Sequence, residues 1–217
     1  MIRFIFLFFI IITSILYVYQ NNLISTINKV DIEGEFNYAD MKLITERAKL
    51  LIGENVYNID LRYQKDEFEK IPWVKYSQIS INPPDHLTVK IIEHTPFFLW
   101  NELNYVNKDM QTFITPNLPI KNILKLSSNN YSHREMYDLF ESIQSYLLDI
   151  NEVIIAISKE DDMLKIKSES LTLVVRYSRY RDKIREFISV YPDFENKLKN
   201  RKNIHIDLRY PTGFAVR

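Results

Sequence analysis

Residues 74–93, VKYSQISINPPDHLTVKIIE, contain the pattern that decides the fold of the first half of the chain. Apolar and polar residues alternate over Val74–Ile81 and again over Leu87–Ile92, which predicts two half-buried strands. The segment between them, NPPDH, contains two prolines and an aspartate, and these residues favour a turn. The sequence therefore predicts a β-hairpin.

The residues before this hairpin predict one strand and two helices. A strand is expected at Lys29–Glu33, followed by a helix over residues 38–51 with Asn37 as its cap. Asp60 is the expected cap of a second helix, over residues 61–71, which Pro72 ends. The apolar residues of the first helix fall at helical spacing: Met41, Ile44, Ala48 and Leu51. The order strand, helix, helix, strand, strand can close a small two-layer core.

Strands dominate the remainder of the chain. A capping box at Ser132–Glu135 opens a helix, and a second helix is expected over residues 182–191, ending before Pro192. The helix that begins at this capping box has an apolar stripe formed by Met136, Phe140, Ile143, Leu147 and Ile150. Strands are expected at Phe97–Trp100, Tyr105–Asn107, Phe113–Ile114, Ile123–Leu126, Val153–Ile157, Met163–Lys167 and Leu171–Arg176. The predicted class is α+β, with helices on one face of a mostly antiparallel sheet, and the predicted domains are residues 29–95 and 96–217.

Residues 203–217, NIHIDLRYPTGFAVR, predict a closing strand and a second short extended segment. Ile204–Arg209 alternates apolar and polar residues, a Pro-x-Gly corner follows, and Phe214–Arg217 is extended. A last strand leaves backbone N–H and C=O groups unpaired along one side unless another chain supplies a strand. We therefore expect Gly213–Arg217 to form an edge strand that is open to a partner.

The N-terminal segment, MIRFIFLFFIIITSILYVYQNN, predicts a membrane anchor. No charge occurs from Phe4 to Tyr19, and a helix over residues 4–23 has roughly the 20 residues needed to span a bilayer. No Ala-x-Ala cleavage site follows, which argues against a signal peptide. Arg3 precedes the helix and the next basic residue is Lys29, so residues 1–3 are expected in the cytoplasm. A buried core helix is the alternative interpretation.

Composition excludes several classes of ligand. The chain has 28 acidic and 28 basic residues, so no net charge attracts nucleic acid. It has no cysteine, which excludes disulfides and thiolate chemistry. Only three glycines occur, so the Gly-rich loops that bind the phosphates of nucleotides are absent from the sequence.

No pattern predicts a catalytic, cofactor-binding or metal-binding residue. The four histidines lack the spacing of a zinc motif, and Glu160–Asp162 fits a solvated hairpin tip better than a calcium loop. No spacing singles out a carboxylate pair for glycan hydrolysis. Trp73 and Trp100 lie in apolar strand contexts, which favour core packing over a role as binding anchors.

Several motifs together resemble one bacterial family. They are VDIEGE at 30–35, IPWV at 71–74, PDHLTVKIIEHTP at 84–96, Trp100, and IDLRYPTGFAV at 206–216. Their order and spacing resemble the division protein family FtsQ, called DivIB in Gram-positive bacteria. The resemblance implies a POTRA domain over residues 29–95 and the β domain of the family over residues 96–217. DMQT at 109–112 departs from the Asp-x-x-Gly turn common in the family, and Lys159 lies where an arginine often helps to hold the partner.

The resemblance implies a non-enzymatic scaffold of the division machinery. Such a protein crosses the inner membrane once at the septum, with its bulk in the periplasm, and it needs no cofactor. It binds FtsB and FtsL, links early division proteins to septal peptidoglycan synthesis, and contacts other division proteins through its anchor and POTRA domain. The implied site for FtsB comprises Arg209, Tyr210, Thr212, Gly213, Phe214, Ala215 and Val216.

Two other classes of protein remain as alternatives. The first is a POTRA-containing periplasmic accessory protein of secretion or envelope assembly, which would share the first domain. The second is a membrane-anchored wall hydrolase, which would need a cleft with a perturbed carboxylate.

Overall fold

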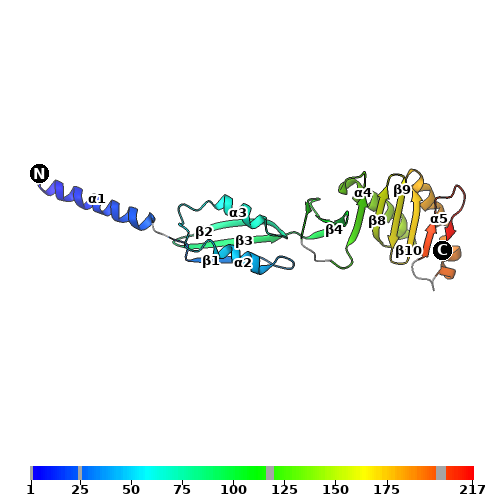
Figure 1. The fold of residues 1–217 in the computed structure, drawn as a ribbon, viewed down its shortest axis with the longest axis horizontal. Helices are drawn as coiled ribbons and strands as arrows, with labels where there is room; N and C mark the ends of the chain where they lie inside the picture. Colours follow the sequence, from blue (N-terminus) through cyan, green and yellow to red (C-terminus); the bar gives the residue numbers. More distant parts are fainter. Residues whose placement is uncertain (1, 24–25, 116–119, 199–203) are drawn as a thin grey trace. The chain divides into compact units, whose positions relative to one another are not determined.

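A computed structural model describes residues 2–23, 26–115, 120–198 and 204–217 (Figure 1). Contacts within the chain separate two compact units, residues 1–94 and 95–217. Each unit has its own hydrophobic core, and each is described by itself below.

Helix α1 spans Ile2–Leu23, and its described side chains, at residues 4–17 and 19, are exposed. Over the residues that the structure describes, no helix combines the length and the apolar character needed to cross a membrane. The anchor expected at residues 4–23 stays a prediction.

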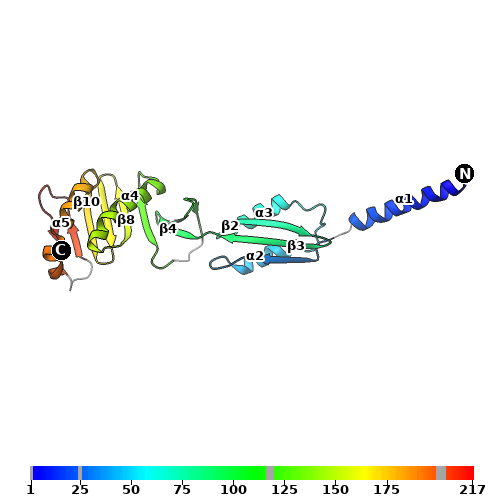
Figure 2. The same ribbon diagram turned by 180° about the vertical axis from the view of Figure 1, so that it is seen from behind.

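The first unit is a three-stranded sheet with two helices. Strand β1 (Lys29–Glu33) pairs in parallel with β3 (His86–Glu93), and β3 pairs antiparallel with β2 (Val74–Asn82), which confirms the predicted hairpin. Helices α2 (Met41–Lys49) and α3 (Leu61–Glu69) complete the unit (Figure 2). Alternate residues of the strands, among them Leu87, Val89 and Ile91, are buried and pack with the apolar residues of the helices.

The structure confirms one predicted helix cap and corrects the other. The side chain of Asp60 accepts hydrogen bonds from the N–H groups of the first turn of α3, as predicted. Asn37 does not cap α2, because Asp40 does so. The N–H groups of Asn37 and Ala39 instead donate to the carboxylate of Glu93, at 2.9 and 2.6 Å. The contact with the end of β3 therefore holds these residues outside the helix. Of the predicted stripe, Ile44, Ala48 and Leu51 are buried, whereas Met41 is exposed.

The second unit is built on one nine-stranded sheet. The strand order is β12-β11-β10-β9-β8-β7-β4-β5-β6. Five of the eight neighbouring pairs are antiparallel, and the pairs β4–β7, β7–β8 and β10–β11 are parallel. The strands are β4 (Pro96–Trp100), β5 (Asn104–Asn107), β6 (Thr112–Phe113), β7 (Leu124–Ser128), β8 (Ile154–Glu160), β9 (Met163–Ser168), β10 (Leu171–Arg176), β11 (Ile204–Asp207) and β12 (Ala215–Val216).

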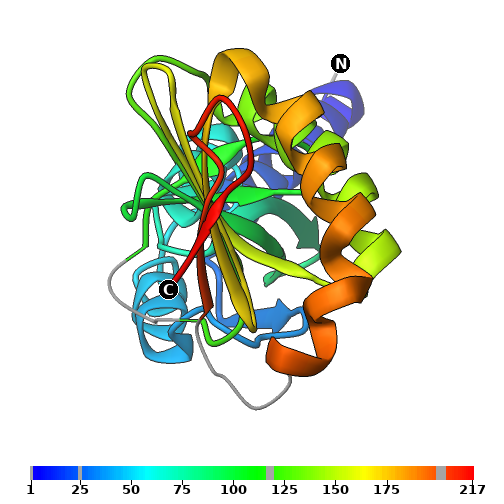
Figure 3. The same ribbon diagram turned by 90° about the vertical axis from the view of Figure 1, so that its right-hand side faces the viewer.

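Two helices cover one face of this sheet. Figure 3 shows α4 (His133–Leu147) and α5 (Tyr180–Leu198) on the same side of the strands. The 3-10 helices Leu148–Ile150 and Tyr177–Arg179 adjoin them. The capping box of α4 is confirmed, since Ser132 and Glu135 exchange their two hydrogen bonds. The buried residues of α4 are Met136, Leu139, Ile143 and Leu147, whereas the predicted Phe140 and Ile150 are only half-buried.

The predicted end of the last helix was wrong. Helix α5 continues through Pro192 to Leu198 instead of ending at Tyr191. A proline inside a helix removes one backbone hydrogen bond. Phe187 and Tyr191 are buried on the sheet with their rings 5.5 Å apart, and this packing holds the helix up to the residue before Pro192.

Both tryptophans belong to the cores, as predicted. Trp73 is buried in the first unit and stacks on Tyr38 with a centroid distance of 4.5 Å. Trp100 is buried in the second unit. Glu160–Asp162 lies at the tip of the β8–β9 hairpin, also as predicted.

Candidate functional site

Strand β12 is the last strand at one edge of the nine-stranded sheet. It pairs antiparallel with β11, with Ile206 opposite Val216 and Asp207 opposite Ala215. Strand β11 pairs in parallel with β10 on its other side. No strand of the described chain lies beyond β12 (Figure 1). One side of β12 is therefore open.

The hydrogen bonds of β12 show which residue faces the open side. The N–H of His205 donates to the C=O of Arg217 at 3.1 Å, and the N–H of Arg217 donates to the C=O of His205 at 2.9 Å. In an antiparallel pair, alternate residues direct their backbone groups toward the partner and away from it. The N–H and C=O of Val216 therefore point away from β11.

The connection between β11 and β12 projects two of the predicted site residues into solvent. Leu208 extends the pairing of β11, since its N–H donates to the C=O of Val174 at 2.8 Å, and its side chain is buried. Tyr210, by contrast, is 47% exposed and lies outside the core, and Thr212 is also exposed. Gly213 has a φ of +67°, in the left-handed region, so a side chain with a branched Cβ would be strained at this position.

The side chains of β12 and its approach are anchored by α5. The ring of Phe214 is half-buried and contacts Phe187 edge to face, with a centroid distance of 5.6 Å. Val216 lies on the same side of the strand as Phe214 and is 39% exposed. Ala215 is half-buried. The contact between Phe214 and Phe187 therefore holds the approach to β12 against α5. Sequence reasoning missed Phe187, although it lies within the helix predicted over residues 182–191.

An ion pair between exposed Arg209 and buried Asp207 fixes the start of the connection. Nε and Nη2 of Arg209 donate to the two carboxylate oxygens of Asp207 at 2.8 and 2.5 Å, and the backbone N–H of Arg209 donates to the same carboxylate at 3.1 Å. These hydrogen bonds from Arg209 lower the pKa of Asp207 from 3.8 to about 2, although burial opposes the shift. Arg209 is thus held beside the edge strand, with part of its side chain exposed.

The pair predicts a pH-dependent contribution to stability. Because the folded pKa of Asp207 lies below the unfolded value, the stabilisation is present above about pH 4 and is lost as the pH falls to about 2. Arg209→Ala should lower the free energy of unfolding by about 2 kcal/mol at neutral pH and by little at pH 2. Urea unfolding at both pH values measures this.

The exposed pair of Arg176 and Asp162, at 3.5 Å, provides the matched control. Arg176→Ala should change the free energy of unfolding by less than about 1 kcal/mol at either pH. An equal loss at both pH values in Arg209→Ala would contradict the assignment.

The edge has the chemistry of a binding surface. It offers a backbone donor and acceptor, a tyrosine and a guanidinium, without a nucleophile beside a base. Within the described ranges, no group of three or more histidine, aspartate and glutamate side chains could hold a metal ion. The structure brings together Arg209, Tyr210, Thr212 and residues 213–216, the set expected from the sequence, on this edge and the turn before it.

Comparison with known proteins finds similarity to FtsQ proteins. The model of the FtsQ-type POTRA domain matches residues 25–94. Cell division protein FtsQ of Haemophilus influenzae is 26% identical over 177 residues, which are 79% of this chain and 69% of that protein. The chain is similar to proteins of the FtsQ/DivIB family. FtsQ of Hahella chejuensis is 27% identical over 87% of this chain and 68% of its own length, and FtsQ of Neisseria meningitidis is 22% identical over 88% and 81%.

The FtsQ relationship extends over both units of the chain. The POTRA match lies in the first unit, whereas the alignments with the FtsQ proteins cover more than three quarters of the chain. The chain is therefore a cell division protein with a POTRA domain.

Proposed function

We propose that the chain is a non-enzymatic scaffold of the division machinery. It binds FtsB and FtsL in the periplasm and links early division proteins to septal peptidoglycan synthesis. Similarity to FtsQ proteins supports this role, and so does a candidate site made of backbone groups and exposed side chains instead of catalytic groups.

The open edge of β12 carries the proposal. A strand of FtsB adds to the sheet by pairing with the N–H and C=O of Val216. Backbone pairing supplies part of the affinity, and side chains around the edge set the register. Exposed Tyr210 offers a large apolar ring with a hydroxyl, and Arg209 offers a charged group for hydrogen bonding. Tyr210, Arg209 and Thr212 border the added strand.

We assign the remaining parts of the chain to attachment and recruitment. Residues 4–23 anchor the chain in the inner membrane, with residues 1–3 in the cytoplasm and the bulk of the chain in the periplasm. The uncharged run from Phe4 to Tyr19 supports this assignment. The POTRA domain, over residues 29–95, docks other division proteins, and residues 96–217 form the β domain that binds FtsB.

The attachment is tested by fractionation of cells. The chain should stay in the membrane pellet after washes with high salt and with carbonate, and a detergent should release it. Release by the washes alone would contradict the anchor, but it would leave the binding of FtsB untouched.

The scaffold function is tested with the full-length chain in detergent micelles. The chain and the purified FtsB–FtsL pair should elute as one complex from a size-exclusion column at micromolar concentration. Deletion of residues 214–217 should abolish the complex and leave the circular dichroism spectrum unchanged. Separate elution of the intact proteins would contradict the proposed function.

A further inference from the structure

The face of the nine-stranded sheet that is turned away from α4 and α5 carries a groove along β8. Strand alternation gives this face the side chains that are not in the core. The register places them in two neighbouring rows across β7, β8 and β9: Lys125, Ala156 and Lys167 in one row, and Ser127, Ser158 and Lys165 in the other.

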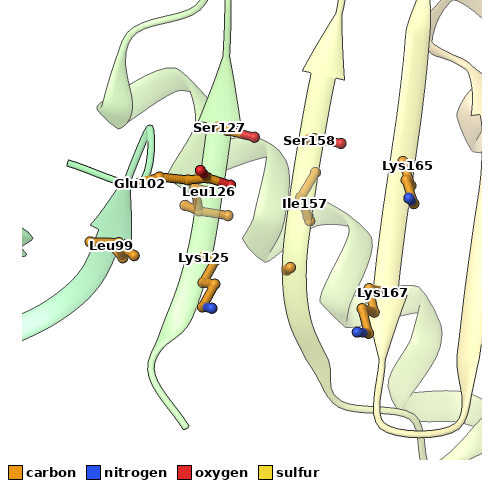
Figure 4. Close-up of a pocket in the computed structure, with 10 residues that line it drawn as sticks. Leu99, Glu102, Lys125, Leu126, Ser127, Ile157, Ser158, Lys165 and Lys167 are labelled. Carbon is orange, nitrogen blue, oxygen red and sulfur yellow. The ribbon is translucent and has the colours of Figure 1, made fainter. Parts of the chain in front are cut away.

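The size of these side chains explains the groove. Beside the three lysines, strand β8 contributes the small residues Ala156 and Ser158 to the open face, whereas lysines project from the strands on both sides. Figure 4 shows Lys125 on one side of β8 and Lys165 and Lys167 on the other. Small residues therefore form the floor, and lysines form both walls.

The three lysines lack the carboxylate partners that some lysines of the chain have. Lys65, Lys70 and Lys183 each contact a carboxylate, at 2.8, 2.5 and 2.7 Å. Among the described residues, no ion pair is formed by the lysines of the groove, and all three are exposed. Glu102 is the acidic residue that also lines the groove. Three like charges around one groove favour an anionic occupant.

The spacing of the lysines indicates the form of the occupant. Lys125 and Lys167 lie two strand spacings apart, roughly 10 Å between Cα atoms. An α-helix with its side chains is about 10–12 Å wide, too wide for the space between the lysine side chains, whereas an extended chain is narrower. Lys165 and Lys167 are two residues apart on one face of β9, about 7 Å, which matches the distance between residues i and i+2 of an extended chain.

We propose that this groove binds an extended acidic segment of a partner protein, with carboxylates at positions i and i+2 beside Lys165 and Lys167 and a third near Lys125. The groove is separate from the edge proposed for FtsB, because three strands lie between β8 and β12. The proposal therefore does not depend on the pairing of Val216. A flat anionic membrane surface is the competing occupant, and it is distinguished below.

The test uses the full-length chain in detergent micelles and a fluorescein-labelled decapeptide of alternating glutamate and threonine. The triple variant Lys125→Gln, Lys165→Gln, Lys167→Gln should bind the peptide at least about tenfold more weakly than the unmodified chain, as the loss of several exposed ion pairs implies. The binding should also weaken as the salt concentration rises. Because the three side chains are exposed, the melting temperature should be unchanged.

The control variant is Lys42→Gln, Lys49→Gln, Lys90→Gln, which removes three exposed lysines of the first unit. It should bind the peptide as the unmodified chain does, and a decapeptide with glutamine in place of glutamate should not bind. Equal weakening in both triple variants, binding of the glutamine peptide, or no binding at all would overturn the proposal. So would groove-dependent binding to vesicles of phosphatidylglycerol that the acidic peptide does not displace.

Discussion

Replacement of Val216 by proline is expected to weaken the binding of FtsB at least about tenfold and to leave the protein folded. Proline removes the N–H that points away from β11, and this donor is the one that an added strand would use. The bonds that hold β12 to β11, between His205 and Arg217, do not involve Val216. Isothermal titration of the full-length chain with FtsB measures the affinity.

Val216→Ala is the matched control, because it shortens the same side chain and keeps the N–H. It should retain most of the affinity of the unmodified chain. Melting curves of both variants check that the second unit is intact. Unchanged affinity in a folded Val216→Pro variant would exclude backbone pairing at this edge.

Phe187→Ala should lower the free energy of unfolding of the second unit by about 3–5 kcal/mol. The ring is fully buried and contacts both Tyr191 and Phe214, at centroid distances of 5.5 and 5.6 Å. Its removal leaves a cavity between α5 and the sheet and takes away the aromatic support of β12. Urea unfolding followed by circular dichroism measures the loss, and FtsB affinity should fall as well.

Tyr210→Ala is the control for this substitution, since it removes an exposed aromatic ring near the same edge. It should change the free energy of unfolding by about 0.5 kcal/mol or less. A loss below about 1 kcal/mol in Phe187→Ala would mean that α5 does not support the edge in the way described.

Local patterns predicted most of the elements of the fold. The hairpin β2–β3, the cap at Asp60 and the capping box of α4 depend on neighbouring residues, and all are present. Two other local predictions were wrong: the helix cap at Asn37 and the helix end before Pro192. A carboxylate 56 residues away holds Asn37, and α5, which packs on the sheet as far as Tyr191, continues past Pro192. Contacts of this kind cannot be read from a local pattern.

The candidate site was predictable in outline and not in its geometry. The Pro-x-Gly corner and the short extended segment after it indicated a closing strand. Which backbone groups of that strand face outward depends on its register with β11, and a pattern of only a few residues after the corner does not fix this register. The lysine groove was missed for the same reason, since Lys125 lies 40 residues before Lys165 and only the pairing of β7, β8 and β9 brings them together.

The exchange of the Val216 amide hydrogen tests the central claim most directly. In the free protein this N–H faces the open edge, whereas the N–H of Arg217 is bonded to His205. At saturating FtsB, the exchange of Val216 should slow by at least about tenfold, and that of Arg217 should change less. If Val216 exchanges equally fast in the free protein and in the saturated complex, FtsB does not add a strand at β12.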